Sequence, residues 1–136
     1  MIPLLTMVML MTTSVAVAST HSLPPCPEKP NCVSSQATDS HRIEPFTVTG
    51  NALSAFEKLR NLLGQRSDTT VISSDEATIR VEFRTMLGFV DDGLFVLDTP
   101  DGLIHIRSAA RSGYWDLGKN RSRMEEIRHA FEKARE

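Results

Sequence analysis

The clearest pattern of apolar and polar positions lies in the middle of the chain. Residues 77–85 alternate between apolar and polar side chains, which predicts a strand with one buried face and one solvent face. The solvent face would carry Arg80, Glu82 and Arg84. Residues 94–97 are apolar at every position, so this strand is expected to lie centrally in its sheet and to be covered on both faces.

A turn and a returning strand follow the apolar run. Residues 99–102 read Thr-Pro-Asp-Gly, a composition typical of a tight turn. Residues 103–108 alternate again and place His105 and Arg107 on one face. If helices bury the other face of the sheet, the charged side chains of both strands share its open face.

Two segments have the spacing of amphipathic helices, at residues 52–63 and at about residues 120–135. The expected capping residues are Asn51 and Gly64 for the first helix and either Asn120 or Ser122 for the second. Short strands at about residues 41–48 and 69–73 complete the set. The sequence therefore predicts an α+β fold: an antiparallel sheet of about five strands, in the order β-α-β-β-β-β-α, with two helices packed on one face.

The N-terminal segment has the pattern of an export signal. Residues 1–18 contain no charged side chain and end in Ala-Val-Ala, a small-x-small cleavage pattern. We expect a signal peptide over residues 1–18, a tail and disulfide loop over residues 19–39, with residues 19–25 disordered, and one α+β domain over residues 40–136. The exported protein would be periplasmic or secreted, with no stable membrane span after cleavage.

Two alternatives for the N-terminal segment stay open. The first is an uncleaved membrane anchor, because about 18 apolar residues is close to the shortest membrane span. The second is a lipid attached at Cys26, which Pro25 directly before it disfavours.

The two cysteines of the chain, Cys26 and Cys32, predict a disulfide in an oxidising compartment. Their five-residue spacing differs from the two-residue spacing of a redox motif, so we expect a structural bridge. This disulfide loop or residues 33–39 would cover the second face of the central strand.

Composition and charge exclude several functions. A net charge of −2 gives no reason to expect a nucleic-acid partner, and any basic site must be local. The four histidines have no metal-ligand spacing, and no serine lies in a nucleophile-elbow pattern. We therefore expect no metal, no cofactor and no catalytic residue, and a non-enzymatic domain.

The candidate site lies around residues 106–123, which hold five of the fifteen basic residues and the only Tyr and Trp of the chain. Arginine presents a fork of donors suited to carboxylate or phosphate. The residues expected to bind an anionic small molecule are Arg84, Arg107, Arg111 and Arg121. The residues expected to support them are Asp91, Asp92, Asp116 and Tyr114.

Three other interpretations compete with an anion site. The arginines and aspartates could pair with each other and only hold the loops in place. The open sheet face and Trp115 could instead dock an envelope protein. A hydrolase would need His105 within hydrogen-bond distance of Asp91 or Asp92.

Three stretches resemble the domain-of-unknown-function family 1499. They are Cys26-Pro27-x-x-Pro30-Asn31-Cys32-Val33-Ser34-Ser35, then Phe89-Val90-Asp91-Asp92, then Arg107-Ser108-Ala109 through Arg111-x-Gly113-Tyr114-x-Asp116-Leu117-Gly118-x-Asn120-Arg121. The resemblance implies a small, often exported bacterial domain and no established activity. Ala110 and Trp115 depart from the family pattern, where a Ser and a small residue are common, so Trp115 is expected to be particular to this chain.

Overall fold

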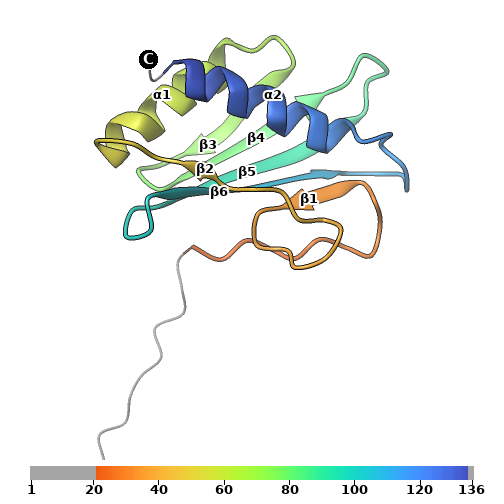
Figure 1. The fold of residues 1–136 in the computed structure, drawn as a ribbon. Coiled ribbons are helices and arrows are strands. Elements are labelled where there is room, and N and C mark those ends of the chain that lie inside the picture. Colours follow the sequence, from red (N-terminus) through yellow and green to blue (C-terminus); the bar gives the residue numbers. More distant parts are fainter. Residues whose placement is uncertain (1–20, 135–136) are drawn as a thin grey trace, which may run out of the picture.

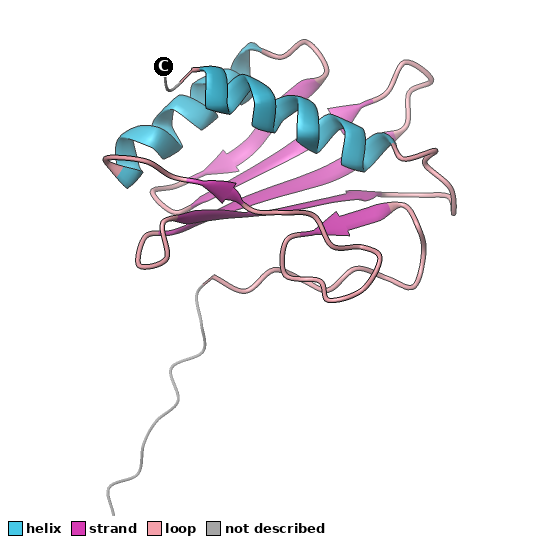
Figure 2. Ribbon diagram, in the orientation of Figure 1, coloured by secondary structure: helices cyan, strands magenta, loops and turns pink. Residues whose placement is uncertain are grey.

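The computed structural model describes residues 21–134, and the predicted signal peptide lies outside the described residues. The elements in chain order are β1 (Cys32–Ser34), β2 (Phe46–Thr47), α1 (Ala52–Gln65), β3 (Thr69–Ser74), β4 (Thr78–Arg84), β5 (Val90–Asp98), β6 (Leu103–Ala110) and α2 (Lys119–Lys133). Figure 1 shows both helices on the same face of one sheet, and Figure 2 shows the two layers.

The sheet is antiparallel and has the strand order β1-β6-β5-β4-β3, with β2 paired to β6 beside β1. The α+β fold and the chain order of helices and longer strands are confirmed. The sheet has six strands, because β1 pairs with β6 through residues that the sequence pattern assigned to a loop. The strand expected over residues 41–48 is much shorter and contains only Phe46–Thr47.

The helix-covered face holds the main core. Its largest fully buried side chains come from both helices and from four strands, and they are Phe46, Phe56, Phe83, Phe95, Phe131, Leu59, Leu63, Ile79, Ile104, Ile106, Met124 and Ile127. The alternation of β4 accounts for its share, because Ile79, Val81 and Phe83 all point to the helices. The charged residues between them therefore face away from the helices.

The strand β5 lies between β6 and β4, so the prediction of a central strand is confirmed. On its open face Leu94 and Val96 pack with Leu23, which is buried. Residues 21–25 are thus an ordered cover where a disordered tail was expected, and Gln36 holds them by accepting the Leu23 N–H at 2.7 Å. Leu23 of this segment packs on the two apolar side chains, where cover by the disulfide loop or by residues 33–39 was expected.

The ends of the two helices agree with the predictions only in part. Asn51 caps α1 as expected and accepts the N–H of Ser54 at 2.8 Å. Gly64 does not end α1, which continues to Gln65. At α2 neither Asn120 nor Ser122 is the cap, because the helix begins earlier, after Gly118 in a left-handed conformation with φ 74°. Within residues 21–134, no helix has the length and apolar character that crossing a membrane requires.

Candidate functional site

The connection from β6 to α2 is held by a cluster of polar residues, here called the polar clamp. It consists of the buried Asn31, Ser108 and Asn120 and the partly buried Asp116. The Ser108 hydroxyl donates to Asn120 Oδ1 at 2.6 Å. Asn120 Nδ2 donates to Asp116 Oδ2 at 2.8 Å and to the Asn31 carbonyl at 3.3 Å. The Asn31 amide in turn donates to the Gly113 carbonyl at 2.8 Å. The clamp therefore joins the disulfide loop, β6 and the start of α2.

Asp116 belongs to this clamp and serves the first turn of α2. Its carboxylate accepts the N–H of Gly118 at 2.9 Å and the N–H of Asn120 at 3.0 Å. Burial alone would raise the pKa of Asp116, but these hydrogen bonds and the one from the Asn120 side chain outweigh it and lower the pKa. Asp116 thus satisfies free N–H groups at a helix start, the task expected of Asn120 or Ser122.

The disulfide between Cys26 and Cys32 is confirmed, with an S–S distance of 2.06 Å. Because Cys32 begins β1 and Asn31 belongs to the clamp, the bridge fixes the loop at the point where it reaches both β6 and α2.

Asp91 and Asp92 point to opposite faces of β5. Asp91 lies on the helix side, where its carboxylate meets Arg123 at 2.9 Å, and both side chains are buried. Arg123 also lies over the Phe83 ring, with its guanidinium carbon 4.6 Å from the ring centroid. The ion pair lacks hydrogen-bond geometry, and Asp91 Oδ2 has no hydrogen-bond donor.

Arg123 was missing from the predicted site. It precedes Ile127 and Phe131 at four-residue intervals, which places it on the buried stripe of α2. That spacing was the available signal, since a charge on an apolar stripe requires a buried partner.

Asp92 lies on the open face and binds Arg111. The guanidinium donates to both carboxylate oxygens, at 2.6 and 3.2 Å, and to Glu82 at 2.9 Å. The hydrogen bonds with Asp92, then those with Glu82, raise the pKa of Arg111. Arg111 and Asp92 therefore form an Arg–Asp pair of the kind that was the alternative interpretation to an anion site.

The other predicted arginines do not gather in one place. Arg107 lies on the open face, where it donates to the Pro25 carbonyl at 3.1 Å while its buried Nε has no hydrogen-bond partner. Burial lowers the pKa of the Arg107 guanidinium. Arg84 ends β4, is exposed, and has no ion-pair partner within residues 21–134. Its register partner on β5 is Val90, whereas that of Arg107 is Leu94.

Arg121 lies apart from both, on α2. It donates to the carbonyl groups of Arg42 at 2.8 Å and Ser40 at 3.0 Å. It therefore fastens the segment before β2 to the helix, and the structure does not bring it together with Arg84, Arg107 or Arg111.

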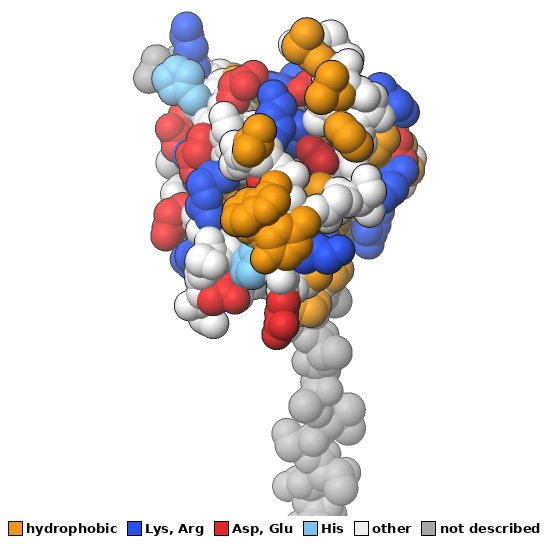
Figure 3. All heavy atoms as spheres, turned by 90° about the vertical axis from the view of Figure 1, so that its right-hand side faces the viewer, with side chains coloured by type: hydrophobic (Ala, Val, Ile, Leu, Met, Phe, Trp, Pro, Cys, Tyr) orange, Lys and Arg blue, Asp and Glu red, His pale blue; other side chains and the backbone are white. Residues whose placement is uncertain are grey.

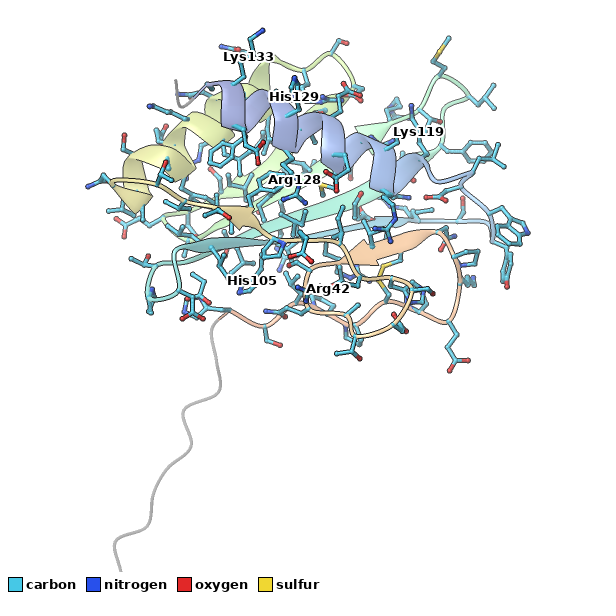
Figure 4. All side chains as sticks on the ribbon, in the orientation of Figure 1. Arg42, His105, Lys119, Arg128, His129 and Lys133 are labelled. Atoms are coloured by element: carbon cyan, nitrogen blue, oxygen red, sulfur yellow. A yellow bond between two sulfur atoms is a disulfide. The ribbon has the colours of Figure 1, made fainter. Side chains whose placement is uncertain are left out.

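His105 contacts a carboxylate, but not one of the two that the hydrolase hypothesis requires. Its Nε2 lies 3.1 Å from Asp98 and its Nδ1 lies 3.4 Å from the Ser35 hydroxyl. Figure 4 shows His105 on the sheet face away from α2, whereas Asp91 lies on the helix face. Asp92 shares the face of His105 but pairs with Ala109, four positions further along β6.

This Ser-His-Asp contact has the composition of a catalytic triad without its accessibility. Ser35 is 3% exposed, and its oxygen accepts the Ile106 N–H at 2.9 Å. Burial would raise the pKa of Asp98, but the hydrogen bonds from His105 and the Asp101 N–H lower it. We interpret the contact as one that fastens the segment after β1 to β6. Among residues 21–134 no group of three His, Cys, Asp or Glu side chains could hold a metal ion.

An exposed apolar surface lies at the end of the sheet where β4, β5 and β6 meet their loops. We call it the apolar end, and it consists of Met86, Leu87, Phe89, Tyr114, Trp115 and Leu117. Within residues 21–134 eight large apolar side chains are exposed, and these are six of the eight. Figure 3 shows apolar side chains gathered on this face of the molecule.

The two loops of the apolar end, residues 85–89 and 112–118, enclose a groove of about 440 Å³, which Ala110 and Lys119 also line. Tyr114 and Trp115 pack edge to face with their ring centroids 5.1 Å apart. Leu117 is held in the left-handed conformation, φ 55°, which is costly for a residue other than glycine. The clamp residue Asp116 and Gly118 flank it, so the clamp holds Leu117 in an outward position.

Sequence reasoning found one half of the apolar end and missed the other. It assigned Trp115 to a contact surface, gave no role to residues 86–88 and expected Phe89 in the core, where the structure instead has Phe89 56% exposed. Their signal was the run Met-Leu-Gly-Phe in a turn between two strands, where polar residues are usual.

The fold and the clamp define a small antiparallel α+β domain with a disulfide-bridged N-terminal loop. A family model described as "Protein of unknown function (DUF1499)" matches residues 22–131, and the chain belongs to this family. Comparisons with curated proteins and with solved structures found no match. All four clamp residues belong to the stretches that carry the resemblance, so these motifs have an architectural role.

Proposed function

We propose that this protein is a non-enzymatic binding domain of the cell envelope that docks an apolar partner surface through its apolar end. One observation carries the proposal: six large apolar side chains from two loops are exposed at one end of the sheet, and five of them line one groove. Contiguous exposed apolar side chains on a folded domain mark contact surfaces. The proposed docking surface lies at the sheet end and includes Trp115, whereas the sequence suggested the open sheet face together with Trp115.

Export is part of the proposal. The uncharged segment before Ala18 and the disulfide between Cys26 and Cys32 both support it, because such bridges persist in oxidising compartments. The partner would accordingly be a component of the envelope.

The test is co-sedimentation with a washed envelope fraction of the protein from residue 19 onward, which contains the whole described fold. The test variant combines Leu87→Ser with Leu117→Asn, since Asn tolerates the left-handed conformation. The matched control combines Leu53→Ser with Ile72→Ser, which removes the two exposed apolar side chains elsewhere. We expect the test variant to bind at least about tenfold more weakly, because each buried Leu contributes roughly 1.5–3 kcal/mol. Equal binding of both variants would contradict the proposal.

A second candidate is the anionic ligand on the open face, now carried by Arg84 and Arg107 alone. Arg111 and Arg121 bind carboxylate or carbonyl groups of the chain, and Arg107 uses one nitrogen, Nη2, for the Pro25 carbonyl. The observation in favour is that Arg84 has no ion-pair partner in the described chain and that Arg107 Nε has no hydrogen-bond partner. Inorganic phosphate or citrate should then raise the melting temperature of the wild type and leave Arg84→Gln/Arg107→Gln unchanged. No rise in the wild type would remove this candidate.

A further inference from the structure

We propose that the partner of the apolar end is an anionic lipid bilayer, into whose surface the loops of residues 85–89 and 112–118 insert. This inference rests on the proposed function and specifies its partner. The first support is the shape of the surface. Met86, Leu87 and Leu117 line the groove but are 104%, 85% and 97% exposed, so they project from the loops at its rim. Projecting aliphatic side chains insert into a fluid layer without a complementary partner.

The aromatic side chains of the same end have the character of interfacial anchors. Tyr114 and Trp115 are the only Tyr and Trp of the chain, and both belong to this surface. These two residue types are enriched at the boundary between headgroups and acyl chains, where an apolar ring with a polar group is favoured. They are less exposed than the three aliphatic side chains, at 52% and 72%.

The charges around the apolar end complement an anionic surface, although the whole chain has a net charge of −2. The nearby carboxylates are engaged within the protein. Arg123 holds Asp91, and the first N–H groups of α2 hold Asp116. Arg84 and Lys119 have no ion-pair partner within residues 21–134. Figure 4 shows Lys119 where α2 begins, next to the loops of the apolar end, and Lys119 also lines the groove.

The geometry suits insertion of the loop tips better than flat adsorption. Both loops leave the same end of the sheet. The clamp and the disulfide loop anchor the base of the loop of residues 112–118. Hydrogen bonds of Thr85 with Gly88 and Phe89 close the loop of residues 85–89. The left-handed backbone conformation of Leu117 costs free energy, and its side chain is nevertheless left exposed. The flanking clamp residue Asp116 therefore holds Leu117 in an outward position at some energetic cost. A bilayer bound here would contact the two loops and would not cover the open face of the sheet.

The experiment uses the fluorescence of Trp115, the only Trp, in the protein from residue 19 onward. Vesicles of phosphatidylcholine alone are compared with vesicles that also contain phosphatidylglycerol. We expect a blue shift of the emission with anionic vesicles, weakened by salt, and much less with neutral ones. Leu87→Ser should lower the affinity about tenfold, and its control Ile72→Ser should not.

The basic residues next to the apolar end, Lys119 and Arg84, are tested by substitution, and Lys133 on the same helix as Lys119 provides the control. Lys119→Gln and Arg84→Gln should each weaken binding to anionic vesicles about fivefold. Lys133→Gln, at the far end of α2, should leave it unchanged. Equal binding to neutral and anionic vesicles, or equal effects of Lys119→Gln and Lys133→Gln, would overturn the inference.

Two outcomes separate this inference from the proposed function. If no vesicle shifts the emission while the envelope fraction still binds through Leu87 and Leu117, the bilayer is wrong and a protein partner takes its place. If the envelope fraction does not distinguish the Leu87→Ser/Leu117→Asn variant from its control, both fail.

Discussion

The connection between β6 and α2 contains two regions of opposite character. On its inner side the clamp residues Ser108 and Asn120 are fully buried. Ser108 donates to Asn120, and Asn120 donates to the Asn31 carbonyl in the disulfide loop. On its outer side Trp115 and Leu117 are exposed and contact little of the rest of the protein. Asp116 lies between them and belongs to the inner side.

The difference separates residues that build the domain from residues left for a partner. Buried polar groups require hydrogen-bond partners, and the clamp supplies them within the chain. Exposed apolar side chains on a loop contribute little to folding, so a contribution to binding explains them better. The family motif through this connection contains the inner residues and also the outer residues Tyr114 and Leu117, whereas Trp115 departs from it.

The largest expected effect on stability is a difference between substitutions at two neighbouring aspartates of β5. Asp91→Ala leaves Arg123 buried without its closest carboxylate and should lower the free energy of unfolding by about 3–5 kcal/mol. Asp92→Ala removes a partly exposed contact with Arg111 and should cost less than about 1 kcal/mol. Urea denaturation of both variants measures the contrast. Similar losses would mean that the two faces of β5 do not differ as described.

The clamp is tested next, by Asn120→Ala. Its loss removes partners from the Ser108 hydroxyl and the Asn31 carbonyl, and the free energy of unfolding should fall by about 2–3 kcal/mol. Asn61→Ala, on the exposed side of α1, is the control and should change stability by less than about 0.5 kcal/mol. A neutral Asn120→Ala would show that the connection is held by other contacts.

Removal of the disulfide should have a slightly smaller effect. The Cys26→Ser/Cys32→Ser variant loses the constraint on a short loop, which is expected to cost about 2 kcal/mol. The corresponding fall in melting temperature is read by circular dichroism. An unchanged melting temperature would count against a stapling role for the bridge.

A small pH effect is expected at the edge of the disulfide loop. His41 donates to the Lys29 carbonyl at 2.7 Å and to Asp39 at 2.9 Å, and these hydrogen bonds raise its pKa above the ordinary 6.5. Its stabilising contribution is therefore complete below pH 6.5 and is lost as the pH rises through the higher folded-state pKa. Unfolding curves from acid to mildly alkaline pH should show wild type losing its advantage over His41→Gln. A constant difference would exclude this role.

The smallest effect on stability is expected at the apolar end. Trp115→Ala should change the free energy of unfolding by less than about 0.5 kcal/mol, since the side chain is mostly exposed. The same variant should lose binding to the envelope fraction. A large loss of stability with unchanged binding would assign Trp115 to the core of the domain.

Local patterns in the sequence were sufficient for the longer elements. The alternation in β4 and the apolar run in β5 each reflect burial on known faces of a sheet, so both were predicted. The strand β1 and the cover by Leu23 depend on pairing or packing with residues far along the chain, which a local pattern does not contain. The same limit explains why Asp116 and not Asn120 serves the start of α2.

The candidate site was predictable only in part. Arg111 and Asp92 both belong to the predicted set and contact each other, but that set did not pair them. The partners of Arg121 and Arg107 are backbone carbonyls, which carry no sequence signal. Phe89 resembled a core residue because its exposure depends on the direction of a loop. The structure was needed to bring it beside Trp115.

Amide hydrogen exchange on the envelope-bound protein tests the central claim most directly. The account predicts new protection in residues 85–89 and 112–118, with the open-face strands β5 and β6 unchanged. Protection centred on the open face around Arg107, with none in the two loops, would contradict the assignment of the apolar end as the binding surface.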